Sequence, residues 1–159
     1  MSGTKTQALL LVEDDPNDIH FFRRGLEKAG LADGLQVAED GEEAIAYLEG
    51  RGPYENRADH TLPALIVLDL KLPKLGGLEV LRWLRGESSH REIPVIILTS
   101  SEQASDIARA QELGVTAYHI KPVDYKDSCD LVKSLGLHWA RLSGTAAGLE
   151  PVAGGDSLV

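Results

Sequence analysis

The sequence has almost no cysteine, few aromatic residues and no long apolar run. Cys129 is the only cysteine, so no disulfide can form within the chain, and a reducing compartment fits. No apolar stretch approaches the roughly 20 residues that a membrane-spanning helix needs, and the polar start lacks the apolar segment of a signal peptide. We therefore expect a cytoplasmic protein with no membrane partner.

Positive charge is also scarce. The 16 Lys and Arg residues face 25 Asp and Glu residues, which leaves a formal net charge of -9. Nucleic-acid binding requires clustered Lys and Arg, so we expect no nucleic-acid partner. The 159 residues, of which 43% are hydrophobic, suffice for one domain with its own core.

Short apolar runs alternate with segments of helical periodicity along the chain. The runs lie at residues 8–12, 35–38, 65–68, 94–98 and 115–120. Uninterrupted apolar runs of this length are typical of strands buried on both faces of a parallel sheet. The alternation predicts an α/β fold with a doubly wound, five-stranded parallel sheet between two helical layers. We expect a domain over residues 1–143 and a flexible tail over the Gly- and Ala-rich residues 144–159.

Capping residues mark the starts of several predicted helices. Asp15 can cap a helix that has Pro16 at its first position. Asp40 and Glu43 have the spacing of a capping box, and Asp124 precedes the last helical segment. These signals place each helix directly after a strand.

Polar side chains follow the predicted strands at the point where each strand ends. Glu13 and Asp14 follow the first strand, Asp69 the third, Thr99 the fourth and Lys121 the fifth. In open parallel sheets the ligand crevice lies outside the carboxyl ends of the strands. These five side chains are therefore expected to meet at one edge of the sheet.

The chemistry of this set favours phosphoryl transfer. Several carboxylates close together repel one another unless a cation or a proton is held between them. Mg²⁺ prefers such oxygen ligands, and a hydroxyl and an ammonium are suitable donors to phosphoryl oxygens. An ionised Asp69 can then act as a nucleophile towards phosphorus and form an aspartyl-phosphate.

The constellation resembles the receiver domain of two-component response regulators, the CheY-like family. The resemblance covers about Ala8 to Leu142 and rests on four motifs in the expected order. They are Leu11–Asp15, Leu68–Pro73 with Gly76–Gly77, Ile97–Ser100 and Lys121–Pro122. It implies a flavodoxin-like sheet with strand order 2-1-3-4-5.

The resemblance implies roles for individual residues. Asp69 would accept a phosphoryl group from a histidine kinase, and the protein would catalyse only its own phosphorylation and dephosphorylation. Glu13, Asp14, Asp69 and the backbone carbonyl of Lys71 would bind Mg²⁺. The side chains of Lys71 and Ser101 are expected to overlook the phosphoryl group and to tune the access of water to it.

Two further residues would form the switch. Thr99 would contact a phosphoryl oxygen and shift towards it, and Tyr118 occupies the position of the family's rotamer-switching aromatic residue. Lys121 would pair with the phosphate. The peptide bond between Lys121 and Pro122 is expected to be cis.

Part of the sequence resembles single-domain regulators that partner phytochrome-type histidine kinases. The matching segments are the loop Gly50–Pro63, Lys121–Tyr125 and Leu135–Trp139. The resemblance implies a homodimer built on the fourth strand, the fifth strand and the last helix, with output through contacts with other proteins. Trp139 either supplies an exposed apolar patch for this dimer or packs the last helix on the sheet.

Two other functions remain open. Aspartate-nucleophile phosphatases of the haloacid-dehalogenase type also place an Asp at a strand end, but they usually carry a second Asp two residues later, where this chain has Lys71. They also need a cap domain, for which the chain has no room. A degenerate receiver that serves only as a docking module would keep the fold and fail to bind Mg²⁺.

Overall fold

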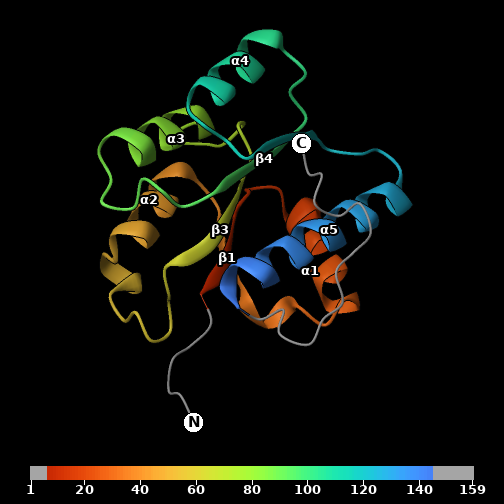
Figure 1. Ribbon diagram of the computed structural model, residues 1–159, viewed down its shortest axis with the longest axis horizontal. Helices are drawn as coiled ribbons and strands as arrows, with labels where there is room; N and C mark the ends of the chain where they lie inside the picture. The colour runs from red at the N-terminus through yellow and green to blue at the C-terminus, as the bar shows by residue number, and fades with distance from the viewer. Residues whose placement is uncertain (1–6, 145–159) are drawn as a thin grey trace.

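Five parallel strands form the centre of the protein, with helices on both faces (Figure 1). The computed structural model describes residues 7–144. The strands are β1 (Ala8–Val12), β2 (Leu35–Ala38), β3 (Pro63–Leu68), β4 (Val95–Thr99) and β5 (Ala117–Ile120). Their order in the sheet is β2-β1-β3-β4-β5 with every neighbouring pair parallel, which confirms the expected fold.

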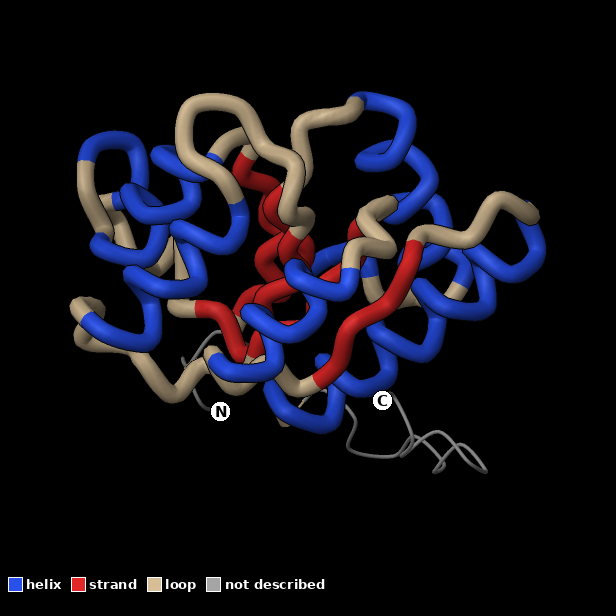
Figure 2. The backbone as a smooth tube through the Cα atoms, turned by 90° about the horizontal axis from the view of Figure 1, so that it is seen from above, coloured by secondary structure: helices blue, strands red, loops and turns tan. Residues whose placement is uncertain are grey.

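The helices form two layers, and the sheet lies between them (Figure 2). One layer contains α1 (Pro16–Lys28) and α5 (Tyr125–Ser143), and the other contains α2 (Gly41–Glu49), α3 (Gly77–Gly86) and α4 (Ala104–Glu112). Two short 3₁₀ turns, η1 (Ala32–Gly34) and η2 (Gly52–Tyr54), lie in the connections. Within residues 7–144, none of the helices has the length and apolarity required to cross a membrane.

The central strand β1 shows how the apolar runs create two cores. Leu9 and Leu11 pack in the core under α1 and α5, whereas Leu10 and Val12 pack in the core under α2 and α3. Successive side chains of a strand point to opposite faces, so a strand covered on both sides must be apolar at every position. All residues of β1 and β3 are buried, as the sequence predicts.

The predicted helix caps are present with one exception. Asp15 caps α1 by accepting two backbone N–H groups of the first turn, and Asp124 caps α5. Asp40 caps α2 by accepting the N–H of Glu43 at 2.7 Å. The Glu43 carboxylate, however, accepts the N–H of Glu39 and not that of Asp40, so only half of the predicted capping box forms.

In the last part of the chain, the structure decides between the two alternatives for Trp139 and contradicts one expectation. Trp139 is only 2% exposed and its indole N–H donates to the carbonyl of Gln7 at 3.0 Å, so it packs α5 on the sheet and supplies no exposed patch. The peptide bond between Lys121 and Pro122 is trans, as is every other peptide bond in the described residues. Trans is the form that bonds to proline favour by about 0.5–1 kcal/mol. The expected tail lies outside the described residues, apart from Gly144.

Candidate functional site: an acidic cluster with a half-buried lysine

The carboxyl ends of the strands bring the predicted residues together. Two backbone hydrogen bonds extend the sheet pairing by one residue beyond the strands. The N–H of Asp69 donates to the carbonyl of Val12, and the N–H of Lys121 donates to the carbonyl of Thr99. Glu13, Asp14 and Asp69 each place one carboxylate oxygen within 4.8 Å of the others. The predicted convergence of these side chains therefore holds.

Asp69 is buried and is held by three donors. Its Oδ1 accepts the hydroxyl of Thr99 at 2.7 Å and the backbone N–H of Lys71 at 3.1 Å. Its Oδ2 accepts the ammonium of Lys121 at 2.9 Å. Both oxygens are thus oriented by residues from β4, from the loop after β3 and from the end of β5. This support fixes the orientation of the carboxylate relative to the rest of the site.

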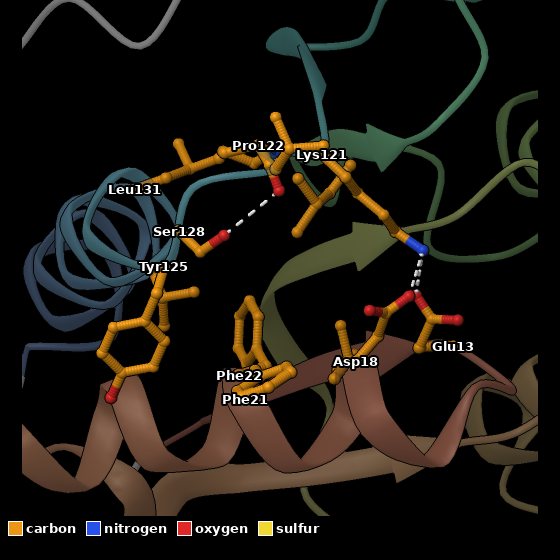
Figure 3. A pocket seen from close by; sticks show the side chains of 13 residues that line it. Glu13, Asp18, Phe21, Phe22, Lys121, Pro122, Tyr125, Ser128 and Leu131 are labelled. Atoms are coloured by element: carbon orange, nitrogen blue, oxygen red, sulfur yellow. Dashed lines mark hydrogen bonds and ion pairs between the residues drawn. The ribbon is translucent and has the colours of Figure 1, made fainter.

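Lys121 contacts two further carboxylates besides Asp69 (Figure 3). Its Nζ lies 2.7 Å from Glu13 Oε1 and 2.7 Å from Asp18 Oδ2. Burial alone would lower the pKa of Lys121, but the hydrogen bonds to Asp18, Asp69 and Glu13 outweigh it and raise this pKa. The side chain is therefore a permanent cation at the centre of an acidic site.

In Glu13 the effect of burial on the pKa outweighs that of the hydrogen bonds, which is the reverse of Lys121. Removal from water raises its pKa to about 7, although the hydrogen bonds from Lys121 and from the N–H of Asp15 lower it. Desolvation thus exceeds the attraction of one shared ammonium, as it often does for buried ion pairs. A carboxyl group in this state binds a proton readily and releases it when a stronger cation arrives.

The acidic cluster is compatible with a divalent metal ion. Carboxylate oxygens are the ligands that hard divalent cations prefer. Glu13 and Asp69 are buried, whereas Asp14 is exposed, so the cluster opens to solvent on one side. Lys71 is exposed and its N–H contacts Asp69, but its carbonyl remains only a predicted ligand.

The hydroxyl groups of two further predicted residues, Ser101 and Tyr118, donate hydrogen bonds to residues other than Asp69. Ser101 donates its hydroxyl to Asp106 at 2.6 Å, in the first turn of α4, so its expected influence on the access of water stays a prediction. Tyr118 donates its hydroxyl to the carbonyl of Ser101 at 3.0 Å. This contact connects β5 to the loop that follows Thr99.

Asp18, which lies outside the acidic cluster, is the one partner of Lys121 that the sequence pattern did not reveal. It lies 103 positions from Lys121, in the first turn of α1, where the helix dipole alone explains an acidic residue. Only the fold geometry could have indicated this role from sequence. The first turn of a helix that directly follows β1 lies beside the same edge of the sheet as the strand ends. Its contact with Lys121 forms the polar end of an apolar pocket between α1 and α5, near Phe22 (Figure 3).

The family follows from comparison with known proteins. Residues 9–133 match the response regulator receiver domain, and the chain belongs to this family. It is 35% identical over 133 residues to the response regulator Rcp1 of Synechocystis sp., covering 84% of this chain and 88% of that protein. It is also 35% identical over 144 residues to the probable methanogenesis regulatory protein FilR2 of Methanothrix harundinacea, with 87% and 88% coverage.

Solved structures give the same result. The Mn²⁺-bound form of Rcp1 has a TM-score of 0.75 at 34% identity, over 84% of this chain and 94% of that chain. The bacteriophytochrome response regulator AtBRR has a TM-score of 0.67 at 42% identity, over 89% and 94%. The predicted CheY-like fold and the resemblance to phytochrome-associated single-domain regulators are confirmed.

Proposed function

We propose that this protein is the phosphoacceptor of a two-component phosphorelay and that Asp69 accepts a phosphoryl group from a histidine kinase. One observation carries the proposal. The buried carboxylate of Asp69 is held by Thr99 and Lys121 and lies beside two further carboxylates. This set supplies a nucleophile, a metal site and two donors for phosphoryl oxygens at one point. It also argues against a degenerate docking module, which has no need of such a set.

The transfer can be written from these contacts. An oxygen of Asp69 attacks phosphorus, and the bond from phosphorus to the kinase imidazole breaks. The imidazole keeps the electron pair and takes a proton from solvent. Thr99 and Lys121, which now donate to Asp69, then donate to the phosphoryl oxygens.

Glu13, Asp14 and Asp69 are the residues that would hold Mg²⁺, with the carbonyl of Lys71 as a fourth ligand. When bound, the ion neutralises charge on the carboxylates and on the phosphoryl oxygens. Ionised carboxylates are required, so Glu13 must lose the proton that its raised pKa favours.

The output of phosphorylation would pass through Thr99 and Tyr118. Thr99 exchanges its bond to Asp69 for one to a phosphoryl oxygen and moves the loop that follows β4. Tyr118 is tied to that loop through the carbonyl of Ser101, so its rotamer responds. The protein thereby acts through contacts with other proteins and not as an enzyme with a separate substrate.

The partners are proposed from the relatives. RcpA, 32% identical with a TM-score of 0.77, is a cyanobacterial phytochrome response regulator, and AtBRR is a bacteriophytochrome response regulator. We therefore propose a phytochrome-type histidine kinase as the phosphoryl donor in the cytoplasm.

We also propose a homodimer built on β4, β5 and α5. Ile120 on β5 and Leu142 on α5 support it because they are 37% and 42% exposed. Sedimentation of Leu142→Arg tests the dimer, since a folded variant of unaltered mass excludes this side chain from the interface.

One experiment tests the phosphoacceptor function. The wild type and Asp69→Asn are incubated with acetyl phosphate and Mg²⁺, and their intact masses are compared. We expect the mass of one phosphoryl group to be added to the wild type alone. Asp59→Asn, which changes an acid in the Gly50–Pro63 loop, is the matched control and should be phosphorylated like the wild type. Equal phosphorylation of Asp69→Asn, or none of the wild type, contradicts the proposal.

A further inference from the structure

The ammonium of Lys121 has as many carboxylate partners in the structure as it has N–H groups. An ammonium has three N–H donors. Lys121 faces three carboxylates at hydrogen-bonding distance, those of Glu13 and Asp18 at 2.7 Å and that of Asp69 at 2.9 Å. A phosphoryl oxygen can therefore receive a hydrogen only when one of these three partners gives it up.

The three partners differ in what happens to them during the reaction. Glu13 and Asp69 belong to the acidic cluster with Asp14, so a metal ion at that cluster draws on their charge. Phosphorylation also removes the charge that Asp69 offers to Lys121. Asp18 lies outside the cluster, so neither a metal ion there nor phosphorylation of Asp69 engages its carboxylate directly. It is therefore the one of the three carboxylate partners whose contact with Lys121 need not change during the reaction.

The support of Asp18 is suited to this task. Its backbone N–H donates to the cap residue Asp15, which in turn donates its own N–H to Glu13 at 3.0 Å. Helix α1 is held closely against α5, because a Cβ at Gly25 would lie 2.7 Å from Val132. The side chain of Asp18 is 39% exposed, and that of Lys121 only 20%, so Asp18 holds the ammonium from the solvent side.

We infer that Asp18 is a positioning residue for phosphoryl transfer, and this inference rests on the proposed function. Asp18 holds the ammonium of Lys121 from the α1 side, so that an N–H stays directed at the reacting oxygens after Glu13 and Asp69 have been engaged. Without Asp18 the long lysine side chain is free to follow the remaining carboxylates or to turn to solvent. Loss of one charge-assisted hydrogen bond that orients a catalytic group should slow transfer about tenfold.

The test compares rates of phosphorylation by acetyl phosphate at saturating Mg²⁺. Asp18→Ala should be about tenfold slower than the wild type, and Asp18→Asn should recover part of the rate, because its amide oxygen still accepts an N–H. Glu42→Ala is the matched control, since Glu42 is an exposed acid in the first turn of α2 and also favours a helix start. We expect it to remain within about twofold of the wild type. Calorimetry should show the Mg²⁺ affinity of Asp18→Ala unchanged within about threefold, because Asp18 is outside the cluster.

A double substitution shows whether Asp18 acts through Lys121. If it does, Asp18→Ala has no further effect on the rate in a Lys121→Met background. The inference is overturned if the loss is the same in both backgrounds, or if Asp18→Ala alone reacts as fast as Glu42→Ala. It is also overturned if Asp18→Asn is as slow as Asp18→Ala. A wild type that takes up no phosphoryl group contradicts the proposed function itself, which is a different result.

Discussion

Two half-buried cations, Arg85 on α3 and Lys121 after β5, meet different partners. Lys121 faces three carboxylates. Among residues 7–144, the partners of Arg85 are backbone carbonyls at distances from 2.8 to 3.2 Å, and these belong to Arg91, Ile93, Leu113 and Gly114. Burial lowers the pKa of Arg85, whereas hydrogen bonds to carboxylates outweigh burial and raise that of Lys121.

The difference separates a structural cation from a functional one. Backbone carbonyls are neutral and fixed, so Arg85 has one arrangement and connects α3 to the loop before β4 and to the end of α4. Carboxylates are charged and movable, and a metal ion or a phosphoryl group can replace them as partners of the lysine. Only the site of Lys121 should therefore respond to Mg²⁺.

Removal of the lysine charge should have the largest effect on the free energy of unfolding. Lys121→Met leaves Glu13, Asp18 and Asp69 without their shared cation and should lower the free energy of unfolding by about 3 kcal/mol in metal-free buffer. Mg²⁺ should then stabilise the variant more than the wild type, because the ion replaces the lost charge. Urea denaturation with and without Mg²⁺ measures both values. Equal stabilisation of the two proteins by Mg²⁺ would remove the link between Lys121 and the metal site.

Removal of the arginine should have a smaller effect that does not depend on metal. Arg85→Ala leaves several carbonyls without a donor and should cost about 2 kcal/mol of unfolding free energy. Arg82→Ala, an exposed arginine on the same helix, is the control and should change stability by less than about 0.5 kcal/mol. The same denaturation series tests both variants. A stability loss in Arg85→Ala that Mg²⁺ restores would break the comparison.

The smallest predicted effect is on the pH dependence of stability. The pKa of Glu13 is raised by burial from 4.5 to about 7, so its protonated form favours the folded state. This contribution is complete below the unfolded pKa and is lost as the pH rises through the folded pKa. The metal-free protein should lose about 1 kcal/mol of stability between about pH 6 and about pH 8.

Glu13→Gln provides the control for this pH effect. The unfolding free energy of this variant should depend less on pH in that range, because the amide does not titrate. Saturating Mg²⁺ should likewise reduce the pH dependence of the unfolding free energy of the wild type. An identical slope for the wild type and Glu13→Gln would assign the pH dependence to other groups.

The strands and most of the site could be predicted because each depends on local signals, whereas the strand order was expected only from the resemblance to receiver domains. Continuous apolar runs such as Leu65–Leu68 specify a strand covered on both sides, and β3 contains this run. The residues directly after each run then share one edge of the sheet. For that reason Asp69, Thr99 and Lys121 were predicted together and are found in contact.

The features that were missed depend on how two helices meet. Gly136 inside a helix indicates a cost from sequence alone. In the structure a Cβ there would lie 2.7 Å from the Leu26 side chain, so a larger residue would have to displace that side chain where α1 and α5 meet. The apolar stripe of α5 gives no indication of which surface it faces, and Trp139 lies against the sheet. Asp18 likewise reaches Lys121 only because α1 is packed in this position.

The most direct measurement locates the modified residue. Protein phosphorylated with acetyl phosphate and Mg²⁺ is reduced with borohydride, which converts an aspartyl-phosphate into homoserine, and the peptides are sequenced by mass spectrometry. We predict homoserine at position 69 and at no other acidic residue. Homoserine at position 13, 14 or 18, or an unchanged Asp69 in protein that carries the phosphoryl mass, would contradict the account.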